Sequence, residues 1–95
     1  MEAETIIETA RKVVSGHSTD RDKGSERTFR DIARVFNALT GHNLTEKDAD
    51  IFMVIVKLVR AYRNDDPDNY VDAIGYMGMA GEAATGKDSD VTENP

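Results

Sequence analysis

One apolar run in the middle of the chain limits most strongly what this sequence can fold into. Residues 51–59 are Ile-Phe-Met-Val-Ile-Val-Lys-Leu-Val, apolar at every position except Lys57. Such a run fits either a buried strand or a helix that packs on several sides. Thr45 is a good helix N-cap with Asp48 as its capping-box partner, and helical spacing continues to Arg63. We therefore predict a central helix that buries more than one face.

Three further segments carry helical patterns, because their apolar residues recur at three- and four-residue steps. They cover about residues 3–15, 26–40 and 67–84. Gly16 is expected to end the first of these helices and Gly41 the second. Ser25 is a candidate N-cap, and Asp66 followed by Pro67 is a strong start signal for the last helix. The pattern predicts an all-α fold, a small bundle of about four helices.

Residues 1–84 form a single helical domain in this interpretation, and residues 85–95 form an acidic tail that we expect to be disordered. A chain this short buries a small share of its surface, so we expect it to assemble as a homo-oligomer. Gly75, Gly78 and Gly81 weaken the last helix by up to about 1 kcal/mol each. Close approach to a neighbouring helix, in the same subunit or another, would offset that cost, as would close approach to a ligand.

Composition excludes several classes of function. The chain has no cysteine, which excludes disulfides, thiolate catalysis and cysteine-based metal sites. No apolar run approaches the roughly 20 residues of a membrane span, and the N-terminus lacks the basic region of a signal peptide. We therefore expect a cytoplasmic protein that binds no membrane. The formal net charge of −6 repels a duplex phosphate backbone, which disfavours general DNA or RNA binding.

The segment Lys23–Thr28 has the parts of a phosphate site. It leads into the second helix, whose first backbone N–H groups have no partner within that helix. Gly24 would let an anion approach the backbone, and Lys23 and Arg27 supply positive charge. Ser25 adds a hydroxyl. Gly-Ser before a helix is also ordinary capping, and the segment lacks the full phosphate-loop pattern, so both interpretations stay open.

Cationic side chains also gather at the end of the central helix. Lys57, Arg60 and Arg63 lie about one turn apart, and Asp68 and Asp72 follow on the next helix. One interpretation is a partly buried ion-pair lock between the two helices. The other is that Arg60 or Arg63 turns toward a bound phosphate.

The carboxylates of the chain raise the alternative of a metal-dependent enzyme. Compact helical MazG-like pyrophosphohydrolases hold magnesium with carboxylates on adjoining helices. The candidate acids here are Glu46, Asp48, Asp50, Asp68 and Asp72. The first three fit the start of a helix as dipole partners, and the facing helix presents cations instead of acids. His17 and His42 stand alone in expected loops. We therefore expect no enzymatic activity, no metal site and no cofactor, with a helical protein-interaction domain as a further alternative.

Three segments together resemble the phage anti-CBASS sponge family, over roughly residues 4–84. They are Lys23-Gly24-Ser25-Glu26-Arg27-Thr28-Phe29 with Ile32-Ala33 and Phe36-Asn37, then Leu44-Thr45 with Val56-Lys57-Leu58-Val59-Arg60, then Asp68 with Asp72-Ala73-Ile74-Gly75-Tyr76. The resemblance rests on the order and spacing of these segments.

The resemblance implies a helical homo-oligomer, a hexamer in the family, in the cytoplasm of a host bacterial cell. Such a protein binds cyclic dinucleotides and cyclic trinucleotides at separate sites without cleaving them. Lys23 matches a phosphate-binding lysine, Ser25 matches a hydroxyl, and Arg63 or Arg60 matches an arginine near the end of the long helix. The family stacks a first-helix tyrosine on the base, whereas the tyrosines here are residues 62, 70 and 76. The base-stacking residue is therefore unassigned.

Overall fold

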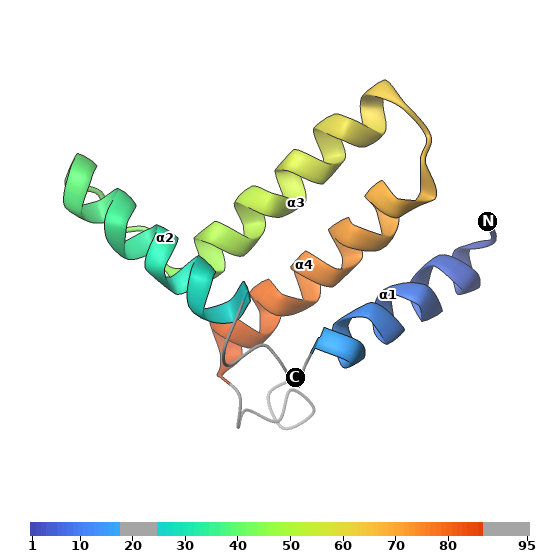
Figure 1. Cartoon of the computed structure of the whole chain (residues 1–95), viewed down its shortest axis with the longest axis horizontal. Coiled ribbons are helices and arrows are strands. Elements are labelled where there is room, and N and C mark those ends of the chain that lie inside the picture. The colour runs from blue at the N-terminus through green and yellow to red at the C-terminus, as the bar shows by residue number, and fades with distance from the viewer. Residues whose placement is uncertain (18–24, 87–95) are drawn as a thin grey trace.

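The computed structural model describes residues 1–17 and 25–86, and these fold into four α-helices with no strand among them. The helices are α1 (Ala3–His17), α2 (Ser25–Thr40), α3 (Glu46–Arg63) and α4 (Pro67–Thr85) (Figure 1). The predicted all-α fold is confirmed, and the apolar run at residues 51–59 is helical. The predicted tail falls almost wholly on residues 87–95, outside the described part of the chain.

Local side-chain chemistry explains where the helices begin and end. The Asp48 N–H donates to the Thr45 hydroxyl at 3.2 Å, and the Thr45 N–H donates to the Asp48 carboxylate at 2.9 Å, which completes the predicted capping box. Asp66 caps α4, with Pro67 at its start. Gly41 follows α2 with a φ of 79°, a conformation that glycine adopts without strain.

The first helix departs from its predicted end. It continues through Gly16 to His17, two residues past the expected boundary, so His17 is helical and does not stand in a loop. Glycine lowers helix propensity by about 1 kcal/mol without removing a hydrogen-bond donor, so it does not stop a helix that continues on both sides.

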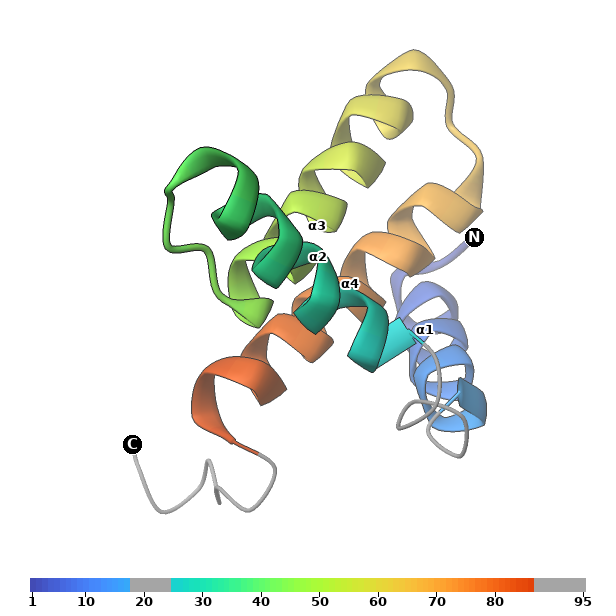
Figure 2. The ribbon, with the colours of Figure 1, turned by 60° about the vertical axis from the view of Figure 1, so that its left-hand side comes forward.

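Helices α3 and α4 pack as an antiparallel pair, and α1 and α2 pack against this pair. α3 and α4 lie side by side, α1 lies along α4, and α2 contacts the start of α3 (Figure 1). Figure 2 shows the same arrangement after rotation, with the far end of α2 directed away from α1 and α4. The ring of Phe29 on α2 meets that of Tyr76 on α4 edge-on, with centroids 5.7 Å apart. This contact holds the beginning of α2 against the pair.

Two asparagines fix the connections on either side of α3. The Asn37 side chain both donates to the Leu44 carbonyl, at 2.9 Å, and accepts from the Leu44 N–H, at 2.7 Å. The Asn64 side-chain oxygen accepts from the Asp66 N–H and from the Asn69 side chain, at 3.0 and 3.1 Å. These bonds supply partners to loop groups that no helix satisfies, so both turns are held in one conformation.

Apart from Phe29, small side chains make up the apolar core of the described chain. The fully buried apolar residues are Ala10, Phe29, Ala33, Ala49, Val71 and Ala80, with no Leu, Ile or Met among them. Large apolar side chains remain exposed, among them Phe52 at 65 % and Leu39 at 81 %. Burying one such side chain contributes about 1.5–3 kcal/mol, so much of the apolar surface that could stabilise the fold contacts no other part of the described chain.

The three glycines of α4 differ in how closely other described residues approach them. A Cβ on Gly75 would lie 3.4 Å from the Val14 Cγ2 atom of α1, so this glycine allows the two helices to approach closely. A Cβ on Gly78 or Gly81 would meet nothing within 4 Å among the described residues. The expected close approach within the subunit therefore holds at Gly75 alone.

In the described part of the chain, none of the helices combines the length and the apolarity that a bilayer crossing requires.

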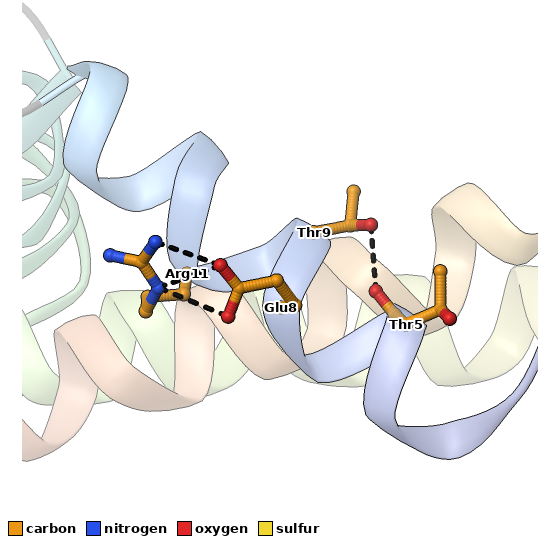
Figure 3. Close-up of polar contacts among 4 residues, drawn as sticks. All are labelled: Thr5, Glu8, Thr9 and Arg11. Carbon is orange, nitrogen blue, oxygen red and sulfur yellow. Dashed lines mark hydrogen bonds and ion pairs between the residues drawn. The ribbon is translucent and has the colours of Figure 1, made fainter.

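We expect Thr45→Ala to lower the free energy of unfolding by about 1 kcal/mol, because the first turn of α3 loses its cap. For a domain of this size the melting temperature should fall by about 4–8 °C. Thr9→Ala is the matched control, since the Thr9 hydroxyl only donates to the Thr5 carbonyl within an exposed turn of α1 (Figure 3). Equal losses in the two variants would contradict the capping role.

The effect of Thr45→Ala should also depend on pH. Hydrogen bonds from the Thr45 backbone and hydroxyl hold the pKa of Asp48 below its ordinary value. A carboxylate with a lowered pKa stabilises the fold above its ordinary pKa, and this contribution is lost as the pH falls through the lowered value. The difference in melting temperature should therefore shrink below about pH 4. Thermal denaturation at neutral and acidic pH measures it, and a constant difference would exclude the carboxylate.

We expect Gly81→Ala to raise the melting temperature, because alanine favours a helix over glycine by about 1 kcal/mol and the new methyl group meets no other described residue within 4 Å. Gly75→Ala should gain less, since its methyl group must fit against Val14. Thermal denaturation compares the two. A loss of stability in Gly81→Ala would mean that another molecule contacts this glycine.

Candidate functional site

The loop that the sequence marks as a phosphate site lies mainly outside the described residues. Lys23 and Gly24 precede the described part of α2, and of Ser25 and Arg27 only the helical backbone is described. Thr28 is exposed in the second turn of α2. The structure therefore shows that a helix begins at Ser25, as the phosphate interpretation requires, and leaves the side chains of Lys23, Ser25 and Arg27 as predictions.

Arg60 and Arg63 are both exposed in the last turn of α3. The Arg60 carbonyl accepts the N–H of Asn64, which ends the helix at that point. Their guanidinium groups therefore stand where solvent or a ligand can reach them. Arginine offers a planar set of donors that fits phosphate oxygens.

These arginines and the start of α2 lie at different ends of α3. Arg30, early in α2, pairs with Glu46 at the first residue of α3, with 3.6 Å between Nε and the carboxylate. Arg63 is the last residue of that helix, about 25 Å away at 1.5 Å per residue. In Figure 1 the start of α2 lies near one end of α3, and the turn into α4 follows the other end. Within one chain, the start of α2 and the end of α3 are therefore too far apart to meet at one small ligand.

Lys57 takes part in an ion pair between the helices. Its ammonium nitrogen lies 3.0 Å from the Asp72 carboxylate on α4, and the two side chains are 14 % and 35 % exposed. This geometry confirms the interpretation of a lock between these helices. Asp68 has a different place, since its N–H donates to the capping carboxylate of Asp66 in the first turn of α4.

Residues 11–30 carry six Lys and Arg against three Asp and Glu, and two of these cations have acidic partners. Arg11 donates through two nitrogens to the Glu8 carboxylate, at 2.8–3.2 Å (Figure 3). The hydrogen bonds between them lower the pKa of Glu8 and raise that of Arg11. Arg30 pairs with Glu46 as described. Both pairs are solvated, so they weaken the positive field of this stretch more than they stabilise the fold.

A groove between α2 and α3, with a volume of about 730 Å³, is the feature that sequence reasoning missed. Its walls are mainly apolar, formed by Ile32, Phe36, Phe52 and Met53, and its rim carries His42, Asn43 and Asp48. The His42 ring stacks on Phe36 at 5.8 Å. The apolar stripe of α2 was visible in the sequence, but the pattern does not say that part of it stays uncovered.

Asp50 has a different environment from the one that the sequence predicts. The sequence places it among the acids that favour the start of a helix, whereas in the structure its side chain is 2 % exposed. It precedes Lys57 by seven residues, a spacing that puts both on the side of α3 facing the other helices. Two charged residues seven apart on an otherwise apolar helix are the sequence feature that could have predicted the burial of Asp50.

Among residues 1–17 and 25–86, the acids and histidines form no group of three or more that could hold a metal ion.

Residues 5–84 match the family described as "Domain of unknown function (DUF6378)". No curated protein and no solved structure matches the chain.

We expect Asp72→Ala to lower the free energy of unfolding, because it leaves the half-buried Lys57 without its partner. The loss should be about 1–2 kcal/mol, which lies between the values typical of exposed and of buried ion pairs. Combining it with Lys57→Met should recover part of the loss. Arg34→Ala is the control, since its pair with Asp31 is exposed and should contribute little. Chemical denaturation compares the unmodified protein, both single variants, the double variant and the control, and additive losses in the double variant would contradict the coupling.

Proposed function

The chain belongs to the DUF6378 family, and we propose that it is a phage anti-defence sponge. In this role it binds cyclic dinucleotide and cyclic trinucleotide immune signals and withholds them from their receptor without cleaving them. The observation that carries the proposal is the sequence resemblance described above, in which a Lys-Gly-Ser segment leads into a helix and arginines end a longer one.

The start of α2 supports a phosphate site. The helix begins at Ser25, so Lys23 and Gly24 directly precede its first turn. The first backbone N–H groups of a helix lack partners within it and favour an anion. Lys23 adds a charge that can reach a phosphate oxygen through a charge-assisted hydrogen bond.

The exposed arginines at the end of α3 support a second site. Arg60 and Arg63 stand at the opposite end of α3 from the helix that follows Lys23. Two groups of cations that far apart suit two ligand classes bound separately, as the resemblance implies. A sponge needs affinity and abundance alone, so it requires no catalytic group.

Assembly is part of the proposal. The described chain buries few large apolar side chains, so self-association offers the missing burial. We propose a homo-oligomer, a hexamer by the resemblance, in the host cytoplasm. It has no affinity for duplex nucleic acid, because the net charge of −6 opposes it.

Two alternatives remain with distinct signatures. A MazG-like hydrolase would need free carboxylates for magnesium, and Asp72, one of its candidate acids, instead pairs with Lys57. A helical protein-interaction domain is favoured by the apolar groove between α2 and α3. It would bind a polypeptide and no nucleotide.

Calorimetric titration with cyclic dinucleotides and cyclic trinucleotides tests the proposal. We expect Lys23→Ala to weaken binding of one ligand class by about ten- to a hundredfold, the loss of one charge-assisted bond to phosphate. Arg63→Ala should affect the other class more. Arg34→Ala is a matched control, because Arg34 is an exposed cation of α2 outside both sites.

Ligand recovered by chromatography after heat release should be intact. Magnesium-dependent products would establish the hydrolase, and retention of no nucleotide would leave the interaction domain. Unchanged affinity in Lys23→Ala and Arg63→Ala, with Arg34→Ala also unchanged, would remove both residues from the sites.

A further inference from the structure

Four exposed apolar side chains form a row along α3. Phe52, Ile55, Val59 and Tyr62 are 65, 51, 49 and 97 % exposed, and we call them the outer row. They follow one another at steps of three, four and three residues. That is the spacing of the apolar seam by which two helices pack together in a coiled coil.

The outer row points away from the rest of the chain. On the opposite side of α3, Asp50 is buried and Lys57 reaches Asp72 of α4. One side of α3 therefore builds the intramolecular core. The other side has the composition of a helix interface and is covered by nothing in the described part of the chain.

The apolar area is large enough for a stable interface. Phe52 joins the outer row to Ile32, Phe36 and Leu44 at the groove between α2 and α3, and these are 49, 40 and 37 % exposed. With about 150–200 Å² on each side chain, the combined patch exposes roughly 600–700 Å². A standard interface buries about 800 Å² per partner, of which about 65 % is apolar in homodimers.

The charges of α3 identify the partner. Its first turn carries Glu46 and Asp48, and its last turn carries Arg60 and Arg63. Glu46 already pairs with Arg30, and a second copy of α3 laid antiparallel would bring Arg63 of each copy toward Asp48 of the other. The helix dipoles would oppose each other as well, which adds to the attraction. This is the arrangement of a two-fold interface, in which one surface meets itself.

We propose that two copies of this chain associate through their outer rows, with the two α3 helices antiparallel. The midpoint of the row falls between Ile55 and Val59, so Ile55 of each copy packs against Val59 of the other, and Phe52 packs near Tyr62. In this register Arg63 of one copy lies opposite Ile51 of the other, about one turn from Asp48. The proposal rests on the homo-oligomer proposed above and names its interface, but it does not depend on nucleotide binding and is tested without nucleotide.

Sedimentation of the full chain at increasing concentration tests the association. We expect Ile55→Glu to raise the dissociation constant on the order of a hundredfold, because it places two carboxylates at the centre of the interface. Ile7→Glu is the matched control, since Ile7 is 57 % exposed on α1, away from the row. A monomeric unmodified protein would overturn the proposal. So would persistent association of Ile55→Glu, or equal dissociation of Ile7→Glu.

Disulfide trapping tests the orientation and does not depend on a destabilising charge. The natural chain has no cysteine, so each introduced thiol reports one position. Mixing Ile55→Cys with Val59→Cys under mild oxidation should give the mixed disulfide in excess over either symmetric product. Ile7→Cys mixed with Ile55→Cys should give little. Predominant 55–55 and 59–59 products would show parallel helices and overturn the antiparallel interface, and the absence of any disulfide would overturn the contact.

Discussion

The pairing of α3 with α4 is the constraint on which the rest of the molecule depends. α1 packs on α4 and α2 packs on the start of α3, so both outer helices are placed by the central pair. That pair is itself joined by a short turn that Asn64 closes, and it is locked by Lys57 and Asp72. The buried apolar residues of these two helices are Ala49, Val71 and Ala80, and many larger apolar side chains remain exposed.

The helices were predictable because their signals are local. The Thr45 capping box and the Asp66-Pro67 start depend only on residues within one turn, and both are present as predicted. Gly16 was a weaker signal, because glycine disfavours a helix without preventing it. The ion pair of Lys57 was one of two open interpretations, since spacing shows which residues share a face but not which group meets them.

The missed features depend on how helices lie relative to one another. Periodicity predicts that the face carrying Phe36 will be buried, yet it does not specify the molecule that buries it. The charge of Asp50 suggested a place at the solvated start of a helix, whereas the packing of α3 buries it. The distance between Arg63 and the start of α2 likewise follows from how the helices pack. The sequence therefore identifies candidate cations, but it does not show which of them lie near one another.

The clamp that Asn37 places on the turn before α3 has an entropic consequence. Both of its hydrogen bonds go to the backbone of Leu44, so the direction of α2 is set by the turn as well as by packing. Fixing the backbone of one residue costs roughly 1–2 kcal/mol, and here that ordering accompanies folding itself. A molecule that docks on α2 therefore meets a surface already held in shape, and more of its contact energy remains as affinity.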